Sequence, residues 1–245
     1  MSGPRLGPLA GAILLRVLAP LSPLLAAQVP ADSDALAGLP VVEVHARARA
    51  DSTLAVLLSG DGGWAAGDRT MAATLAEAGV PVVGLDVPSY LGVARTPEDA
   101  SADLQRLLQH YLAAWRKRRI ILIGYSHGAN LAPFMVSRLP DSLRQRIDLL
   151  AMVSPEDYAS FRFHLADLVT ATKHEGDLPV LPEVEKLRGL RMLCVRGSTD
   201  RRSLCRSLPA DLARVETTAG GHRVPGREGG EIAALILAAA RPPIS

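Results

Sequence analysis

Short apolar runs alternate with amphipathic stretches along most of the chain. Uninterrupted aliphatic runs, typical of strands that are buried on both faces, predict strands at residues 54–58, 80–85, 120–123, 147–153 and 192–195. Two further runs, at residues 41–44 and 214–218, complete the set, the first as an edge strand. Because helical stretches separate these runs, the pattern predicts an α/β fold with a mostly parallel open sheet and helices on both faces.

Four stretches carry apolar residues at the spacing of a helix. They cover residues 68–78, 97–115, 127–139 and 230–240. Gly79 follows the first stretch as a stop signal, and Pro97 opens the second. Pro242 and Pro243 end the last one, which follows the last predicted strand. The other three stretches lie between predicted strands, so they are predicted to be the helices that connect them.

One segment departs from this alternation. Residues 156–188 separate two predicted strands and are long for a single crossover. We interpret them as a small, partly helical lid insertion over the sheet, where substrate pockets are commonly built. The folded domain is predicted to span residues 40–241 as one unit, because open α/β sheets of this size usually stay single.

The N-terminal residues are interpreted as an export signal. Arg5 precedes an apolar run that ends in small residues, which predicts a cleavable secretory signal peptide over residues 1–27. Residues 28–39 would form a short leader segment. Arg16 interrupts the apolar run, so an uncleaved membrane anchor and a mis-assigned start codon remain as alternatives.

Composition and charge exclude several classes of function. Hydrophobic residues make up 48% of the 245 positions, enough for a large buried core. Lys and Arg number 27 against 25 Asp and Glu, and this balance argues against a dedicated nucleic-acid binder. The chain has 2 cysteines, too few for a disulfide scaffold or a four-thiolate zinc site.

The two cysteines are candidates for one bridge. Cys194 lies in a predicted strand, and Cys205 follows after an intervening turn that could bring the two within bridging distance. An exported protein would oxidise them. Two buried free thiols are the alternative, and a catalytic cysteine is disfavoured because neither residue has a histidine nearby in the sequence.

The strongest chemical signal follows the strand predicted at residues 120–123. Residues 124–128 read Gly-Tyr-Ser-His-Gly, and a predicted helix begins at once. A G-x-S-x-G motif between a strand and a helix predicts a nucleophile elbow, in which Ser126 takes a strained backbone conformation and only glycine fits two positions away. The helix N-terminus would favour negative charge there. A structural turn without chemistry is the alternative.

A serine nucleophile needs a base and an acid from later loops. His222 follows the last predicted strand, where the base falls in the chain order Ser, Asp, His. Its neutral imidazole could take the proton of Ser126 and return it to the leaving group. Asp200, in the loop after the preceding strand, is the predicted acid. Glu156 and Asp157 remain alternatives for that acid.

A glycine-rich loop follows the strand predicted at residues 54–58. It reads Ser-Gly-Asp-Gly-Gly-Trp over residues 59–64, and the amides of Asp61 and Gly62 would form an oxyanion hole with the amide of His127. A plain glycine turn is the alternative, and phosphate binding is disfavoured because neither G-x-x-x-x-G-K-[ST] nor G-x-G-x-x-G occurs. A carboxylate at Asp61 would repel an oxyanion, so we expect it to turn away or to face a cationic substrate.

Several side chains near these loops are candidates for contact with the substrate. They are Asp61, Trp64, Tyr125, Glu156, Tyr158 and His164. The ring of His127 is given no role, because its backbone N–H is the group that the elbow uses. No metal site and no cofactor is predicted, since a Ser-His-Asp mechanism needs neither.

Together these motifs resemble the bacterial virulence VirJ/AcvB family. The resemblance covers about residues 40–240 and rests on the motifs at residues 59–64, 84–90, 95–98, 124–130, 139–140 and 220–222 and on the cysteine pair. It implies an α/β-hydrolase fold and export to the periplasm. It also matches Ser126 to the nucleophile of the family, His222 to its base and Asp200 to its acid. His127 in the elbow and Arg223 after the base depart from the pattern of the family, and both touch the pocket.

The resemblance also implies a substrate. AcvB members are linked to hydrolysis of lysyl-phosphatidylglycerol, and some members of the family assist type IV secretion. We therefore expect a periplasmic serine hydrolase that cleaves a carboxylic ester of an aminoacylated phospholipid, whose ammonium would pair with Asp61 or with Glu156 and Asp157. The alternatives are an esterase or thioesterase for another substrate, an acyltransferase, and a binding protein associated with type IV secretion components whose hydrolase site is vestigial.

Overall fold

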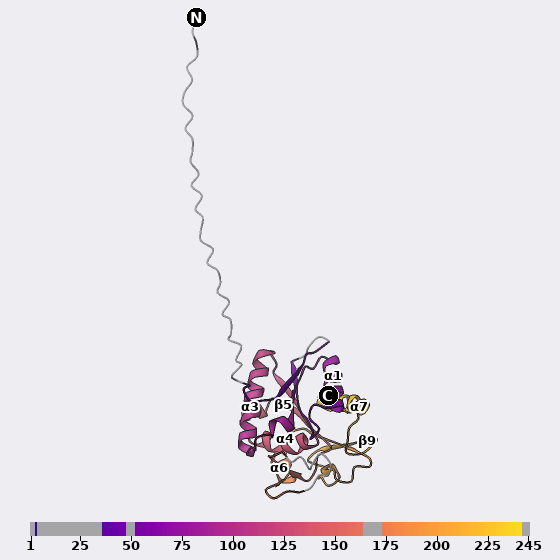
Figure 1. Cartoon of the computed structure of the whole chain (residues 1–245). Coiled ribbons are helices and arrows are strands. Elements are labelled where there is room, and N and C mark those ends of the chain that lie inside the picture. The colour runs from indigo at the N-terminus through magenta and orange to yellow at the C-terminus, as the bar shows by residue number, and fades with distance from the viewer. Residues whose placement is uncertain (1–2, 4–35, 48–51, 164–172, 242–245) are drawn as a thin grey trace. The chain divides into compact units, whose positions relative to one another are not determined.

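The structure is a computed structural model that describes residue 3 and residues 36–47, 52–163 and 173–241 (Figure 1). The chain divides into two units, residues 1–32 and residues 33–245, and the fold below is that of the second. Apart from residue 3, the predicted signal peptide lies outside the described residues. Most of the predicted leader and His164 also lie outside them.

A seven-stranded sheet organises the second unit. In spatial order its strands are β1 (Val41–Val44), β3 (Val82–Leu85), β2 (Thr53–Leu58), β4 (Arg119–Tyr125), β5 (Ile147–Val153), β8 (Met192–Gly197) and β9 (Arg214–Thr218). The pair β1 and β3 is antiparallel, and the other neighbours in this sheet are parallel. All seven predicted strands are present, which confirms the predicted α/β fold class.

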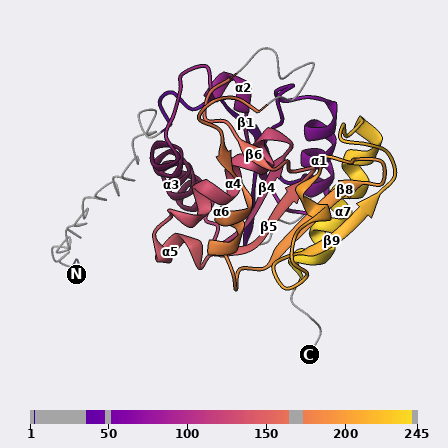
Figure 2. The ribbon, with the colours of Figure 1, turned by 90° about the horizontal axis from the view of Figure 1, so that it is seen from below.

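Helices cover both faces of the sheet, as Figure 2 shows. One face carries α1 (Ala66–Glu77) and α7 (Gly226–Ala240), which pack against each other. The other face carries α3 (Pro97–Ala114), α4 (His127–Ser137) and α6 (Leu181–Lys186). Shorter helical segments are α2 (Val87–Tyr90), α5 (Asp141–Arg144) and the 3-10 turn η2 (Leu204–Arg206).

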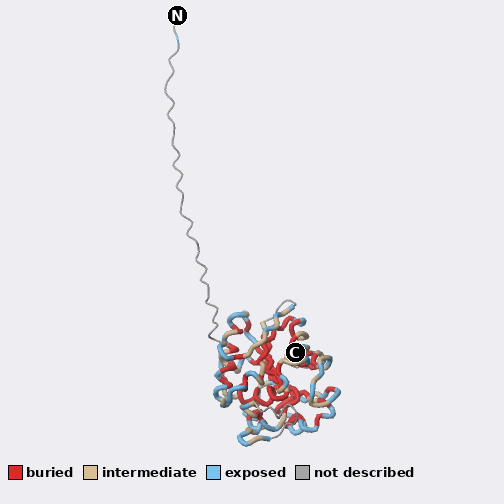
Figure 3. The backbone as a smooth tube through the Cα atoms, in the orientation of Figure 1, coloured by how far each residue is buried: buried red, intermediate tan, exposed pale blue. Residues whose placement is uncertain are grey.

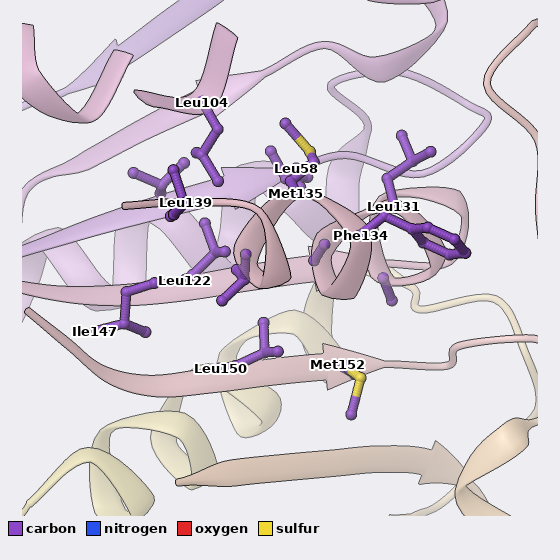
Figure 4. Close-up of a cluster of buried hydrophobic side chains, with 14 of the residues drawn as sticks. Leu58, Leu104, Leu122, Leu131, Phe134, Met135, Leu139, Ile147, Leu150 and Met152 are labelled. Atoms are coloured by element: carbon purple, nitrogen blue, oxygen red, sulfur yellow. The ribbon is translucent and has the colours of Figure 1, made fainter. Parts of the chain in front are cut away.

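The sheet separates two apolar cores. Along β2, Leu54, Val56 and Leu58 point into the core under α3 and α4, while Ala55 and Leu57 point into the core under α1 and α7. This alternation explains why the strand is apolar at every position. Figure 3 shows the buried positions concentrated along the sheet, and Figure 4 shows the α4 side of the core, where side chains of α3, α4 and β5 meet.

The segment between β5 and β8, predicted to be a partly helical insertion, contains strands as well as a helix. Besides α6 it holds a two-stranded antiparallel pair, β6 (Tyr158–Ala159) and β7 (Leu178–Pro179). Strands of two residues, one of them ending in a proline, are too short to leave a periodic signal in the sequence. Among the described residues, none of the helices has the length and apolar character that a bilayer crossing requires.

Candidate active site

The residues with predicted chemistry gather at one edge of the sheet. Asp61 follows β2, Ser126 follows β4, Asp200 follows β8 and His222 follows β9. Because these strands run parallel, their carboxyl ends meet at the same edge, where open α/β sheets hold their ligands. Residues up to 161 positions apart in the sequence (61 to 222) therefore lie around one site.

The turn between β4 and α4 is strained at Ser126. This residue has φ of 51° and ψ of −116°, a conformation that side-chain-bearing residues rarely adopt. A Cβ atom at Gly124 would lie 2.4 Å from the carbonyl oxygen of Gly128, and one at Gly128 would lie 2.3 Å from that of Leu58. Only glycine fits at both positions, so the backbone has the geometry that the G-x-S-x-G motif predicts.

Three side chains form a hydrogen-bonded chain at the elbow. The Oγ of Ser126 lies 2.7 Å from Nε2 of His222, and Nδ1 of the same ring lies 3.2 Å from Oδ2 of Asp200. An ionised carboxylate only accepts hydrogen bonds, so Nδ1 carries the ring proton of a neutral imidazole and donates a hydrogen bond to Asp200. Nε2 is then the free acceptor for the hydroxyl proton of Ser126, the tautomer that a general base requires.

The structure distinguishes among the three candidate acids. Asp200 is buried and reaches the ring of His222, and its Oδ1 accepts a hydrogen bond from the amide of Arg202 at 3.2 Å. Glu156 instead lies 3.3 Å from the guanidinium of Arg202. Burial raises the pKa of Glu156 above its ordinary value, and the neighbouring His222 and Arg202 oppose that shift. Asp157 lines a neighbouring cavity.

A disulfide joins the ends of the loop that carries Asp200. Cys194 of β8 and Cys205 of η2 are bonded, with their Cα atoms 5.6 Å apart. The amide of Leu204 also donates to the carbonyl of Pro155 at 2.8 Å, which holds the far end of the loop to the end of β5. The acid therefore lies on a short closed loop rather than on a free one.

The loop that carries His222 is held from both sides. The amide of Val224 donates to the phenol oxygen of Tyr125 at 2.9 Å, so a residue predicted to contact the substrate also positions the base. Burial raises the pKa of this phenol. On the other side, the amide and hydroxyl of Thr199 donate to the carbonyl of Gly220 at 2.9 and 2.7 Å. The loops of the acid and the base are thus tied together.

Two adjoining cavities open at this edge. The first, of about 800 Å³, contains Ser126 and His222 together with Tyr125 and the glycine-rich loop. The second, of about 400 Å³, is strongly polar and lined by His127, Asp157, Tyr158, Ser160, Lys173, Asp177 and Arg201. Asp61, Glu156 and Arg202 line both cavities, so they stand between the two.

Trp64 lines neither cavity, unlike the other described candidates for substrate contact. Its ring covers Gly84, where a Cβ atom would lie 2.3 Å from the indole, and it packs against the core under α1 and α7. Its amide donates to Oδ2 of Asp86 at 2.8 Å. The indole is large and apolar, so it is used to close the core beneath the loop rather than to line the pocket.

The glycine-rich loop lies directly against the elbow. A Cβ atom at Gly60 would lie 3.2 Å from Cβ of Ser126, and the amide of Gly63 donates back to the carbonyl of Gly60 at 3.0 Å in a tight turn. The amides of Asp61 and Gly62, predicted as oxyanion donors, therefore belong to a loop that adjoins the hydroxyl of Ser126. The amide of His127 belongs to the first residue of α4.

The ring of His127 has contacts that the sequence analysis missed. Its Nδ1 lies 2.8 Å from Oδ1 of Asp61, and its Nε2 lies 2.7 Å from the carbonyl oxygen of Ser160. The carboxylate of Asp61 is thus paired within the protein, an outcome that neither of the two expectations for it included. Residues 61 and 127 are far apart in sequence and share no motif, so no local signal points to this contact.

Comparison with known proteins gives a family and a fold. A family model described as "Bacterial virulence protein (VirJ)" matches residues 52–242. No curated protein matches the chain significantly. Among solved structures, Est1E from Butyrivibrio proteoclasticus has a TM-score of 0.58 at 14% identity, covering 82% of this chain and 94% of its own.

Two further solved structures are similar to a comparable degree. The esterase Pf2001 of Pyrococcus furiosus has a TM-score of 0.57 at 16% identity, covering 82% of this chain and 91% of its own. An alpha-beta serine hydrolase homologue from Coxiella burnetii has a TM-score of 0.55 at 16% identity, covering 81% and 89%. At these identities the likeness establishes the α/β-hydrolase fold, and the predicted fold is confirmed.

Proposed function

Because the chain belongs to the VirJ family of bacterial virulence proteins, we propose that it is a serine hydrolase that cleaves a carboxylic ester. The observation that carries the proposal is the 2.7 Å contact between Oγ of Ser126, on its strained elbow, and Nε2 of His222. The esterases and the serine hydrolase homologue among its structural neighbours support it by analogy of fold.

The proposed reaction proceeds through an acyl-enzyme. His222 takes the hydroxyl proton of Ser126 while Oγ attacks the ester carbonyl, and the resulting imidazolium is stabilised by Asp200. The C–O bond to the alcohol then breaks, and His222 returns the proton to the leaving oxygen. Water, deprotonated by the same ring, attacks the acyl-enzyme, and Ser126 leaves with the proton to regenerate the free enzyme.

Backbone amides would hold the oxyanion of the tetrahedral intermediate. The proposed donors are the amides of Asp61 and Gly62, on the loop beside Ser126, and the amide of His127 at the start of α4. Amides fixed in this way stabilise charge that develops in the transition state without reorganising. The positive end of the dipole of α4 adds to this effect.

For the substrate we propose an aminoacylated phospholipid such as lysyl-phosphatidylglycerol. The polar cavity beside the catalytic one contains the carboxylates of Glu156, Asp157 and Asp177, which a substrate ammonium could approach. The ammonium of Lys173 already lies 4.1 Å from the ring centroid of Tyr158, a cation–π contact that a substrate ammonium could also make. An esterase or thioesterase acting on another substrate would use the same machinery.

The hydrolase proposal is tested by covalent labelling. A fluorophosphonate probe should label the folded wild-type protein and should fail to label Ser126→Ala. Ser154→Ala is a matched control, because Ser154 is also buried with a positive φ (49°) at the end of the neighbouring strand β5. Absence of label on the folded wild type would overturn the proposal and favour a binding protein with a vestigial site.

The substrate is tested on membrane lipids. Extracted lipids are incubated with wild type and with Ser126→Ala and compared by mass spectrometry. Loss of aminoacylated phospholipid in the wild-type sample alone supports the proposed substrate. If Asp157→Asn lowers kcat/KM equally for lysyl esters and for neutral esters, Asp157 does not pair with the substrate ammonium.

We also propose that the protein acts in the periplasm. The disulfide between Cys194 and Cys205 supports this location, because such bonds persist in oxidising compartments. The signal peptide expected over residues 1–27 points the same way. Fractionation of cells that express the full chain, with intact-mass measurement, should find a periplasmic form that lacks about 27 residues. Retention of the full chain in the cytoplasm would contradict the proposal.

A further inference from the structure

Both ring nitrogens of His127 face oxygen atoms. Nε2 lies 2.7 Å from the carbonyl oxygen of Ser160, which can only accept a hydrogen bond, so Nε2 carries a proton. Nδ1 lies 2.8 Å from Oδ1 of Asp61, and a second proton must lie between these two atoms. Imidazolium is a weaker acid than a carboxylic acid, so this proton is assigned to the ring.

The pair of His127 and Asp61 therefore has no net charge, and it connects three segments. Asp61 lies on the glycine-rich loop after β2, and His127 lies at the elbow after β4. Ser160 belongs to the segment between β6 and β7. The side chain of His127 is 9% exposed and that of Asp61 is 25% exposed, so water screens the contact less than it would on an open surface.

We propose that the ring of His127 is a positioning group that holds the glycine-rich loop against the elbow and neutralises the carboxylate of Asp61 beside the reacting ester. This inference rests on the proposed function, in which the amides of Asp61 and His127 bind the oxyanion. The two residues that supply those amides are tied to each other through their side chains, which fixes the distance between the donors. Such fixed donors are what oxyanion stabilisation requires.

The charge of the pair matters as much as its position. A bare carboxylate at Asp61 would repel the negative charge that develops on the ester oxygen. Two of the neighbouring cations have other partners, because Arg202 lies 3.3 Å from Glu156 and Lys173 lies over the ring of Tyr158. A protonated ring at His127 offsets this repulsion without altering the backbone of either residue.

A kinetic double-mutant cycle tests the coupling. His127→Phe keeps the backbone amide but leaves Asp61 unpaired, so kcat should fall about 100-fold while KM changes less than about threefold. Asp61→Asn removes the charge and keeps a side chain that can contact the ring, so kcat should fall about tenfold. The double variant should recover to about the level of Asp61→Asn, because no unpaired carboxylate remains.

Several outcomes would overturn the coupling. Losses that multiply to about 1000-fold in the double variant would show independent roles, and an unchanged kcat in His127→Phe would show no role. If His127→Phe fails to fold, His127→Gln enters the same cycle, because its amide can donate to one of the two oxygens but not to both. His45→Gln is the control, since His45 is exposed and lies 3.6 Å from Glu43 in an ion pair outside the site.

A second readout does not depend on activity. In a sample labelled with ¹⁵N-histidine, both ring nitrogens of His127 should show protonated shifts at neutral pH, and the Nδ1 signal should change in Asp61→Asn. The signals are assigned by their loss in His127→Gln. An Nδ1 shift typical of an unprotonated nitrogen at neutral pH would overturn the inference even in an active enzyme. So would an Nδ1 shift that is the same in Asp61→Asn as in wild type. Absence of Ser126-dependent hydrolysis would instead refute the proposed function and leave this measurement valid.

Discussion

In the proposed mechanism, the efficiency of the base depends on one buried carboxylate. Asp200 accepts a hydrogen bond from Nδ1–H of His222 and so selects the tautomer that can accept from Ser126. In Asp200→Asn the amide can donate to Nδ1 and favour the wrong tautomer. We predict that kcat for a chromogenic ester falls about 10³- to 10⁴-fold with little change in melting temperature.

The matched control for this prediction is the rival acid. Glu156 lies near the site but pairs with Arg202, so Glu156→Gln should lower kcat by about tenfold or less. Equal losses in the two variants would mean that Asp200 has no special role. A larger loss in Glu156→Gln than in Asp200→Asn would show that Glu156, and not Asp200, is the acid.

The elbow sets a steric limit at Gly124. An alanine there would place its Cβ 2.4 Å from the carbonyl oxygen of Gly128, so the strand and the helix must move apart. We predict that Gly124→Ala lowers the free energy of unfolding by about 1–3 kcal/mol, as overpacking does elsewhere. Urea denaturation measures this change. Gly62→Ala, which has open space, should remain close to wild type in stability, and similar losses in both variants would contradict the argument.

Single residues differ in how visible their roles are in the sequence. Ser126 could be placed on an elbow because its motif is contiguous, and His222 and Asp200 could be proposed because they follow strands in the order that the fold requires. The contact of His127 with Asp61 depends on the spatial neighbourhood of two loops, which no local pattern encodes. The packing of the Trp64 indole on Gly84 of another strand is absent from the local pattern for the same reason.

At the scale of elements, the disulfide links β8 to η2 and closes the loop that carries Asp200. We predict that the double variant Cys194→Ala, Cys205→Ala loses about 2–4 kcal/mol of unfolding free energy. Its kcat should fall with KM nearly unchanged, because the acid is less well held. Wild-type protein that is reduced but still folded should show the same kinetic loss. Full turnover in that sample would reject a positioning role for the bridge.

The boundaries of elements follow packing as well as sequence pattern. The last helix was expected from residue 230, but α7 begins at Gly226 and includes Gly229 and Gly230. Glycine disfavours a helix by about 1 kcal/mol per residue, so propensity alone disfavours this earlier start. The close packing of α7 on α1 outweighs that propensity, since a Cβ atom at Gly229 would lie 2.5 Å from the carbonyl oxygen of Gly67.

For the whole molecule, the free energy of unfolding should depend on pH through a carboxyl group other than that of Asp200. Burial raises the pKa of Asp68 from 3.8 to about 6, although the amide of Ala65 donates to it. A raised pKa means that the folded state prefers the neutral acid, so this contribution is complete below pH 3.8 and is lost as pH rises through about 6. A shift of about 2 units corresponds to about 3 kcal/mol.

We therefore predict that Asp68→Asn is more stable than wild type above pH 7 and that the difference vanishes near pH 4. The asparagine keeps an oxygen that can accept from Ala65 and carries no charge to desolvate. Urea denaturation across this pH range measures the difference, with Glu185→Gln at an exposed position as the control. A difference between Asp68→Asn and wild type that is independent of pH would contradict the assignment.

The bridge between Cys194 and Cys205 has a consequence for the timing of activity. A newly made chain in a reducing cytoplasm would carry two thiols there, and the loop holding its acid would be free to move. Such a copy would be a poor catalyst beside the inner leaflet that surrounds it. With the proposed location and lipid substrate, oxidation after translocation would complete the enzyme, and hydrolysis of membrane lipids would begin only once the protein had left the cytoplasm.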